Sequence, residues 1–578
     1  MPTPIFSDSL GSPRRKGEWT ALPSSDSSIY PVGARSSFAN LSNQYSLSHN
    51  PQDWGLNLSP NYVEDDDALH MPTIQSNSIW GLSTFSKRGI GNCGCLLVVI
   101  VGILLLFVAY PIIAAARLQQ LDKSGAFNFG GINASGQIPM IQGNYGLIDE
   151  DTPREAYTRP SWNDPTKNMQ LVFSDEFNTD GRTFYAGDDP YWEAVDLHYW
   201  QTNNMEWYDP EAIVTEGGSL VITLSQKETH NLNYQGGLLS TWNKFCFTGG
   251  YIEANVQLPG FNNILGFWPA IWAMGNLGRA GYGASLEGTW PYSYDTCDVG
   301  TAPNQTLNGL PVAARTGGDP EHDGALSYLP GQKLSRCTCD GESHPGPKHP
   351  DGTFVGRSAP EIDVFEAQIN QDTLIADVSQ SAQWAPFNNR YLWKNSSANM
   401  IIADPAISQQ NSYVGGITQQ ATSVTTRTDP NSYEFSGGRY ATYGFEYKPG
   451  FDEGYITWIS SGEMAWTLRG LGLGPDPSVQ IGARPVSQEP MYLIMNLGMS
   501  KNFGPVDLEN LPFPAHMRVD YVRVYQPEDA INIGCDPKEF PTADYINKYI
   551  EAYTKPNLTT WVDDYKQPWP RNSLLGQC

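Results

Sequence analysis

The stretch Pro360-Glu361-Ile362-Asp363-Val364-Phe365-Glu366-Ala367 decides both the fold and the chemistry that the sequence predicts. It sets three carboxylic acids in an otherwise apolar segment, where burying a carboxylate is costly. On a regular β-strand the first two acids share one face, whereas Glu366 points to the other face. One bulged residue, Val364 or Phe365, would return Glu366 to the face of the first two acids. We therefore expect a bulged strand that points all three acids into one cleft.

Three acids in one cleft favour the hydrolysis or transfer of glycosides. The bulge leaves four regular strand steps, roughly 13 Å, between the Cα atoms of Glu361 and Glu366. Side chains that lean inward can shorten this to the separation of about 5–5.5 Å between the carboxyl groups of a retaining glycosidase. Glu361 would then attack the anomeric carbon, and Glu366 would first donate and later accept the proton. Asp363 would hydrogen-bond to Glu361 and help to separate the two pKa values. The alternative is an acidic edge strand that faces water, with Ile362 and Val364 inward.

Short segments with β-strand character continue on both sides of this strand, bounded by Gly, Pro, Asn or Asp. Several alternate with a period of two, and beyond residue 116 a helical period is visible only near residues 543–553. The clearest segments are Leu220–Leu224, Tyr251–Leu258, Phe267–Met274, Tyr440–Tyr447, Tyr455–Ile459, Met491–Asn496 and Val519–Tyr525. Many short antiparallel strands over about 360 residues predict an all-β sandwich rather than a barrel.

An uncharged run from Gly89 to Ala116 predicts one membrane-spanning helix, a signal anchor at residues 93–116. A buried core helix and a cleaved signal peptide are the less favoured alternatives. Residues 1–92 are polar and lack periodicity, which predicts a disordered cytosolic tail. Residues 117–165 are expected to form a lumenal stalk, residues 166–527 the β-domain with a long insertion at about 278–358, and residues 528–578 an extension packed on or near it.

Six cysteines lie beyond the predicted span: Cys246, Cys297, Cys337, Cys339, Cys535 and Cys578. An even number in a loop-rich region predicts disulfides formed in an oxidising compartment, although fifteen pairings are possible. We expect Cys337 and Cys339 to fix the insertion to the sheet. The alternative is a set of unrelated free thiols, and the spacing of these cysteines does not fit a zinc site. Glycosylation sequons beyond the span begin at Asn133, Asn304, Asn395 and Asn557. Together they predict a type II membrane protein of the secretory pathway (endoplasmic reticulum, Golgi or plasma membrane) with a lumenal or extracellular C-terminal domain.

The net charge of −26 argues against a nucleic-acid partner, because a polyanion repels phosphate backbones. A neutral polysaccharide is indifferent to this charge, and the aromatic content of 12% supplies faces on which sugar rings stack. The sequence indicates no cofactor and no metal site, although a structural calcium ion cannot be read from it. The expected partners are therefore a polysaccharide and, through one helix, the lipid bilayer.

The catalytic stretch resembles the bulged signature of glycoside hydrolase family 16, the laminarinase-like jelly-roll enzymes. Further segments resemble that family's motifs in the family's order and together cover about residues 168–527. They are Phe173-Ser174-Asp175-Glu176-Phe177, Gly250-Tyr251-Ile252-Glu253-Ala254, Phe267-Trp268-Pro269-Ala270-Ile271-Trp272, Asn496-Leu497-Gly498 and Val519-Asp520-Tyr521-Val522-Arg523-Val524-Tyr525. The resemblance implies a concanavalin-like jelly-roll sandwich with Glu361 as nucleophile and Glu366 as acid/base.

More narrowly, the whole chain resembles the fungal β-glucan synthesis-associated membrane proteins, which are needed for cell-wall β-1,6-glucan. The polar tail, the anchor, the cysteine-bearing insertion and the segment around Trp384 carry this likeness. It implies a β-glucan substrate. Residues implied to contact sugar are Trp268, Trp272, Trp384, Gln383, Asn204 and Glu206. Any one of the tryptophans is as readily explained as a core residue.

Two positions depart from the pattern of family 16. Laminarinases usually carry a histidine in the strand after the catalytic one, where this sequence has Gln383, and the basic residue common after the Glu-Ala pair is here Asn255. Both changes are expected to remove a proton donor or a charge from the cleft. The leading hypothesis is a membrane-anchored retaining β-glucan hydrolase or transglycosylase. A non-catalytic glucan-binding scaffold is the alternative, and a lectin-like receptor is a weaker third option.

Overall fold

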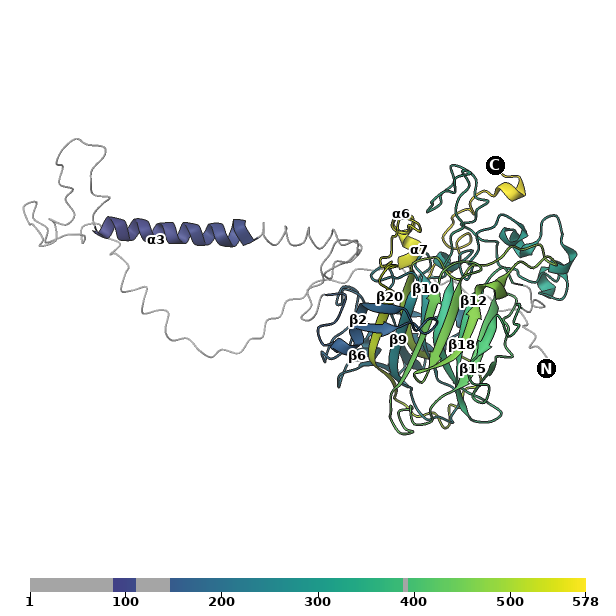
Figure 1. Ribbon diagram of the computed structural model, residues 1–578, viewed down its shortest axis with the longest axis horizontal. Helices are drawn as coiled ribbons and strands as arrows, with labels where there is room; N and C mark the ends of the chain where they lie inside the picture. Colours follow the sequence, from purple (N-terminus) through teal and green to yellow (C-terminus); the bar gives the residue numbers. More distant parts are fainter. Residues whose placement is uncertain (1–86, 111–145, 388–392) are drawn as a thin grey trace, which may run out of the picture. The chain divides into compact units, whose positions relative to one another are not determined.

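The computed structural model describes residues 87–110, 146–387 and 393–578 (Figure 1). The chain divides into two units, Met1–Val101 and Gly102–Cys578. Helix α3 (Lys87–Leu104) begins in the first unit and is followed by a π-helical turn, η3 (Leu105–Ala109). Its apolar side chains are exposed, among them Leu96 and Phe107.

The predicted membrane span is only partly covered by these residues. Across the described ranges, no helix combines the length and the apolar character that crossing a bilayer requires. The last part of the predicted span, residues 111–116, and the predicted tail up to residue 86 lie outside the described residues.

The β-domain is a sandwich of two sheets, each with ten strands among the described residues, which confirms the predicted all-β class (Figure 1). In the first sheet the order is β1-β2-β20-β9-β16-β17-β18-β13, with β7 beside β20 and β6 beside β7. Its strands are β1 (Thr158–Pro160), β2 (Asn168–Asp175), β6 (Ile213–Thr215), β7 (Leu220–Leu224), β9 (Gly250–Gln257), β13 (Met400–Ile402), β16 (Ala441–Lys448), β17 (Tyr455–Ser460), β18 (Glu463–Arg469) and β20 (Ala515–Pro527).

The second sheet carries the acidic stretch near its middle, in the order β14-β15-β12-β11-β10-β19-β8-β5-β4, with β3 beside β8. Its strands are β3 (Glu193–Ala194), β4 (Leu197–His198), β5 (Glu206–Tyr208), β8 (Tyr234–Ser240), β10 (Trp268–Gly275), β11 (Glu361–Ile369), β12 (Ala376–Trp384), β14 (Ser408–Gln410), β15 (Gln420–Arg427) and β19 (Met491–Gly498). All seven segments predicted as strands are found as strands.

Apolar residues of both sheets meet in one large core. Ile252 and Ala254 on β9 and Val364 and Phe365 on β11 belong to the same buried cluster. Side chains on the outer face of the second sheet form a separate cluster, which includes Trp272. The sheet that bears the acids is therefore buried against the first sheet on one face and carries its functional side chains on the other.

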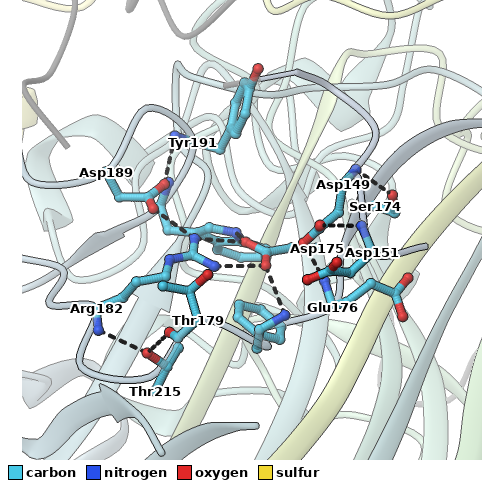
Figure 2. A network of polar contacts seen from close by, with 12 residues as sticks. Asp149, Asp151, Ser174, Asp175, Glu176, Thr179, Arg182, Asp189, Tyr191 and Thr215 are labelled. Atoms are coloured by element: carbon cyan, nitrogen blue, oxygen red, sulfur yellow. Dashed lines mark hydrogen bonds and ion pairs between the residues drawn. The ribbon is translucent and has the colours of Figure 1, made fainter. Parts of the chain in front are cut away.

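The domain begins earlier than the predicted boundary at residue 166. β1 pairs with β2 along the edge of the first sheet, so the last part of the predicted stalk belongs to the sandwich. Before it, the Asp149 carboxylate accepts the Glu176 amide N–H at 3.0 Å (Figure 2). Figure 2 also shows the Arg182 guanidinium between Asp175 and Asp189, at 2.8 and 2.7 Å. The Phe173–Phe177 motif is thus hydrogen-bonded to the segment that precedes β1.

The insertion and the C-terminal extension consist mainly of loops and short helices. They contain α5 (Gly283–Leu286), α6 (Ala543–Lys548) and α7 (Ile550–Thr554), the last two drawn in yellow in Figure 1. Short 3₁₀ turns in the domain are η4 (Arg154–Tyr157), η5 (Trp200–Thr202), η6 (Pro210–Ala212), η7 (Val299–Thr301), η8 (Pro303–Gln305), η9 (Val312–Arg315), η10 (Pro320–His322), η11 (Gly470–Leu473) and η12 (Ser573–Leu575).

All six distal cysteines are oxidised, as predicted. The pairs are Cys246–Cys535, Cys297–Cys337 and Cys339–Cys578. The expectation that Cys337 and Cys339 fix the insertion to the sheet is wrong. Cys337 closes a loop within the insertion, and Cys339 joins the insertion to the C-terminal residue. The C-terminal extension is instead attached to the core beside β8 and β9 through Cys246.

Candidate active site

The predicted bulge is present in β11. Against β10, Phe365 pairs with Ile271 and Asp363 pairs with Trp272, so Val364 is the extra residue. Against β12 the register shifts by one residue between Ile362 and Glu366. Val364 and Phe365 consequently both lie in the core. Glu361, Asp363 and Glu366 share the opposite face, as the sequence predicted.

Two core side chains satisfy backbone groups that the bulge takes out of the ladder. The Trp458 indole N–H on β17 donates to the Asp363 carbonyl at 2.7 Å. The Gln380 amide on β12 donates to the Val364 carbonyl at 2.9 Å and also to the Ile459 carbonyl at 2.9 Å. Because buried carbonyls without partners are costly, these donors stabilise the bulge that sets the position of Glu366.

Glu361 is partly buried and, among the residues that the structure describes, has no cationic partner. Its Oε2 accepts the indole N–H of Trp290 at 2.5 Å. Burial raises the pKa of Glu361 to about 8, and the charge of Glu366 adds to this, whereas hydrogen bonds from Trp290 and Asp363 oppose it. The bulge places Glu366 on the same face of β11 as Glu361.

Asp363 is buried between the two glutamates. Its Oδ2 accepts the Ser381 hydroxyl at 2.8 Å and the Gln383 amide at 3.2 Å. Burial and the neighbouring Glu361 raise the pKa of Asp363 well above its usual range. A protonated Asp363 donates to Glu361 and so favours the ionised form of that glutamate, as expected from the sequence.

Within the described part of the chain, the donors to Glu366 are neutral. Its carboxylate accepts the Trp268 indole N–H at 3.0 Å and the Ser379 hydroxyl at 3.3 Å. Burial raises the pKa of Glu366 to about 8, with a further contribution from Asp363. A raised pKa favours the protonated form that a general acid requires. Because the pKa of Glu361 is raised to the same value, the donors around each glutamate, and not these pKa values, distinguish the two.

Of the three tryptophans expected to stack on sugar, two lie on the face of the acids and one does not. Trp268 lies beside Glu366, with its ring stacked on Phe503 at 4.2 Å between centroids. Trp272 pairs with Asp363 across the strands, and its N–H donates to Asn496 at 2.8 Å. Trp384 is buried in the core and donates to Thr422, so its predicted sugar contact is wrong.

Trp384 faces the core because of the register of β12. Glu361 pairs with Gln383, which places Gln383 on the catalytic face and its neighbour in the chain on the other face. Gln383 contacts Asp363 and is therefore part of the acidic cluster, whereas its sugar contact stays a prediction. The side-chain oxygen of Gln383 is buried without a hydrogen-bond partner among the described residues.

Asn204 and Glu206 form a buried network at the end of β5. The Asn204 amide donates to Glu206 at 2.7 Å and to the Tyr208 hydroxyl at 2.9 Å, and Asn496 donates to the same hydroxyl at 3.2 Å. Asn496 in turn holds Trp272. Burial raises the pKa of Glu206 to about 7. A chain of side-chain hydrogen bonds thus connects Asn204 and Glu206 to Trp272, which lies on the sheet face that carries the three acids.

Asn255 lies outside the cleft, contrary to the expectation that it alters the site. It stands on β9 in the first sheet and donates to Asp520 at 3.1 Å. Its neighbours Ala254 and Val256 face the core, so the Asn255 side chain points to the outer face of that sheet. Replacing a basic residue here does not change the charge at the catalytic carboxylates.

Sequence reasoning missed Trp290, Ser379 and Ser381, all of which donate to the three acids. The serines could have been found, because they flank Gln380 with the period of a strand next to the catalytic one. No local signal points to Trp290, because it precedes the acids by seventy-one residues and reaches them through the insertion.

Other predicted positions are placed as follows. Asn557 is exposed, Asn304 and Asn395 are partly buried, and Asn133 lies outside the described residues. Glycosylation therefore stays a prediction. Within the described ranges, no three His, Cys, Asp or Glu side chains are grouped so that they could hold a metal ion.

Residues 56–578 match the family described as "Beta-glucan synthesis-associated protein SKN1/KRE6/Sbg1". The chain belongs to this family. The SKN1/KRE6/Sbg1 relative "Beta-glucan synthesis-associated protein KRE6" of Saccharomyces cerevisiae is 40% identical over 526 residues, which are 89% of this chain and 69% of the relative. The SKN1 protein of Candida albicans is 39% identical and matches over 90% of this chain and 67% of its own length.

Some of the more distant matches of this chain are to glucanases. Endo-1,3-1,4-beta-glycanase EglC of Rhizobium meliloti is 31% identical over 164 residues, 24% of this chain and 32% of that protein. Among solved structures, the catalytic domain of an endo-1,3-beta-glucanase (laminarinase) from Thermotoga petrophila is 20% identical, with 63% of this chain and 99% of that chain covered and a TM-score of 0.34.

Proposed function

We propose that this chain is a retaining β-glucan hydrolase or transglycosylase, with Glu361 as nucleophile and Glu366 as acid/base. One observation carries the proposal. The bulge in β11 gathers three carboxyl groups on one face of a sheet, with indole, hydroxyl and amide donors but no cation paired to them in the described part of the chain. Sites where burial and like charges raise pKa values are typical of acid–base chemistry.

The contacts divide the work between the two glutamates. Glu361 receives hydrogen bonds from Trp290 and from protonated Asp363, which stabilise its carboxylate and suit it to attack the anomeric carbon. Glu366 gives its proton to the glycosidic oxygen as that bond breaks. A covalent glucosyl ester on Glu361 results, and the departing sugar leaves as a neutral alcohol.

In the second half of the reaction the now ionised Glu366 takes a proton from an incoming hydroxyl. That hydroxyl attacks the anomeric carbon, the ester bond to Glu361 breaks, and the nucleophile returns to its carboxylate form. With water as acceptor the result is hydrolysis, and with a sugar hydroxyl it is transfer. We favour transfer, because a protein associated with β-glucan synthesis gains little from net hydrolysis.

We place the substrate and the setting within the same proposal. The family description and the names of the KRE6 and SKN1 relatives support a β-glucan, and β-1,6-glucan of the fungal cell wall is the polymer we propose. The uncharged run Gly89–Ala116 supports an anchor in the membrane, and three disulfides support a lumenal or extracellular domain. Carbonate extraction and protease protection of sealed microsomes test this placement.

A glucan-binding scaffold is the second candidate, because Gln383 stands where laminarinases usually carry a histidine. The chemical test uses an activated aryl β-glucoside with azide. In Glu361→Ala the azide should replace the nucleophile and give the inverted α-glucosyl azide. In Glu366→Ala it should react with the covalent intermediate and give the β-glucosyl azide.

The two variants control for each other, since only their opposite product configurations assign the roles. If neither variant responds to azide, and the wild type neither cleaves nor transfers defined β-1,3- and β-1,6-gluco-oligosaccharides, the scaffold replaces the enzyme.

A further inference from the structure

The C-terminal extension, residues 528–578, packs on the segment of the insertion that leads to Trp290. The Ala284 amide in α5 donates to the Leu558 carbonyl at 2.9 Å, and the Trp561 amide donates to the Glu287 carboxylate. Gly283 has no room for a side chain, because a Cβ there would lie 2.4 Å from the Thr559 carbonyl oxygen. The extension thus contacts both ends of α5 through its backbone.

Side chains reinforce this contact. Ala284 and Leu334 of the insertion share a buried cluster with Tyr545, Tyr553 and Trp561 of the extension. The Lys333 Nζ lies 3.4 Å from the centroid of the Trp561 ring. The extension is therefore packed on the turn formed by residues 283–290 and is not a loose tail.

From α5 the turn runs directly to the catalytic strand. The Trp290 amide donates to the Leu286 carbonyl at 2.9 Å, so Trp290 is held one helical turn after α5. The Ala359 amide donates to the Thr289 carbonyl at 2.9 Å, two residues before Glu361. At the end of this path the Trp290 indole donates to Glu361.

We propose that the C-terminal extension is a positioning element of the active site, which acts through α5 and Glu287 to hold the Trp290 indole against the Glu361 carboxylate. The inference rests on the proposed function for its catalytic meaning. An indole N–H that donates to the charged carboxylate favours ionisation, so displacing it lowers the fraction of Glu361 that is ready to attack. The extension would thereby tune the nucleophile without touching the substrate.

Other groups that influence Glu361 lie outside the extension and outside residues 283–290. Asp363 and Glu366 lie on its own strand, Tyr199 precedes η5, Tyr492 lies on β19, and Tyr413 follows β14. Within the described residues no cation pairs with Glu361. A change confined to the extension and the turn should therefore reach Glu361 through Trp290.

The test compares two leucine substitutions in the full-length protein. Glu287→Leu removes the acceptor for the Trp561 amide on the turn. Glu342→Leu is the matched control, because Glu342 also accepts from the extension, from Arg571 at 2.5 Å, but does not lie on the turn. Trp290→Phe keeps an aromatic ring and removes the indole N–H together with the five-membered ring that carries it.

The readout is the pH dependence of covalent labelling of Glu361 by an epoxyalkyl β-glucoside, located by peptide mass spectrometry. We expect Trp290→Phe to move the midpoint upward by about one pH unit, a tenfold loss of labelling on the acid side. Glu287→Leu should move it in the same direction with about a threefold loss, and Glu342→Leu should not move it.

A purely structural role for the extension predicts a lower unfolding temperature for Glu287→Leu with an unchanged midpoint, and that result would overturn the inference. An unchanged midpoint in Trp290→Phe would overturn it as well. If the wild type is not labelled at any pH, the proposed function fails separately. In that case infrared spectroscopy measures the titration midpoint of the Glu361 carboxyl, as the difference between each variant and the same variant with Glu361→Gln. The same pattern of midpoint shifts then tests the inference.

Discussion

Two groups of buried acids in this domain have opposite surroundings. Near the start of the domain, Asp175 is paired with Arg182 and Glu176 with Arg523, each through two hydrogen bonds of 2.8–2.9 Å. In β11, Glu361, Asp363 and Glu366 have no such partner in the described part of the chain and receive only neutral donors. Both groups are held by strands of the same sandwich.

The difference shows how one fold uses carboxylates either for stability or for chemistry. Although at Asp175 burial outweighs Arg182 and the pKa is still raised, a nearby cation opposes the rise in pKa that burial causes. Glu193 illustrates this: burial alone would raise its pKa, but Arg279 and Lys244 outweigh burial and lower it. The unpaired acids of β11 all have raised pKa values, about 8 for Glu361 and Glu366.

The largest expected effect comes from neutralising the unpaired group. Glu361→Gln and Glu366→Gln should each reduce glucan turnover by about 10²–10⁴-fold, because each removes one chemical role while preserving shape. Both variants should keep the circular dichroism spectrum and the three disulfides of the wild type. Normal wall glucan in cells that carry either variant would contradict the catalytic assignment.

Neutralising the paired group should have the reverse outcome. Glu176→Gln removes the nearest carboxylate from the buried Arg523 guanidinium, which then keeps Glu253 at 4.0 Å, and this should lower the free energy of unfolding by about 3 kcal/mol. Turnover per folded molecule should be unchanged. The exposed pair of Glu211 with Lys227 is the control, and Glu211→Gln should leave urea unfolding unchanged. Equal effects of the two substitutions would remove the distinction between buried and exposed pairs.

The pH dependence of stability should also differ between the two groups. Burial raises the pKa of Glu366 to about 8, so its contribution to stability is complete below the ordinary pKa and is lost as pH rises through about 8. Glu366→Gln should therefore be more stable than the wild type by up to about 5 kcal/mol at pH 9 and equal to it near pH 4.

For Glu193 the sign is opposite. Its pKa is lowered in the folded protein, so its contribution is present above the ordinary pKa and is lost as the pH falls. Glu193→Gln should be less stable than the wild type at pH 7, and the gap should close in acid. Denaturant unfolding at several pH values measures both differences, and parallel profiles would contradict the comparison.

The smallest expected effects come from tryptophan substitutions on the two faces of the sheet that carries the three acids. Trp268→Phe removes the N–H donated to Glu366 and should lower kcat by several-fold, with a shift in the basic limb of the pH profile. Trp384→Phe, on the core face, should lower stability slightly and leave kcat and KM unchanged. A KM effect of Trp384→Phe would place that ring back in the cleft.

The strands and the bulge could be predicted because their signals are local. Three acids in an apolar strand admit few arrangements, and Glu366 reaches the face of Glu361 only through one extra residue. The face of Trp384 could not be read in the same way. β12 is buried along its whole length and shows no alternation, so its register against β11 is a tertiary property.

Long-range partners could not be predicted for the same reason. Any pairing of six cysteines is compatible with the sequence, and the structure alone shows that Cys339 joins the C-terminal residue. Trp290 reaches Glu361 only because the insertion folds back under the extension. Such contacts depend on packing between segments, and no periodicity or motif near Trp290 records them.

The central claim is that Glu361 forms a covalent bond with the sugar, and trapping that bond tests it most directly. A 2-deoxy-2-fluoro β-glucosyl donor with a good leaving group should form the ester and slow its breakdown. Mass spectrometry should then show one fluoroglucosyl group per protein, on the peptide that contains Glu361 and absent from Glu361→Gln. An adduct on another residue, or turnover of the natural glucan with no adduct and an inverted product, would contradict the account.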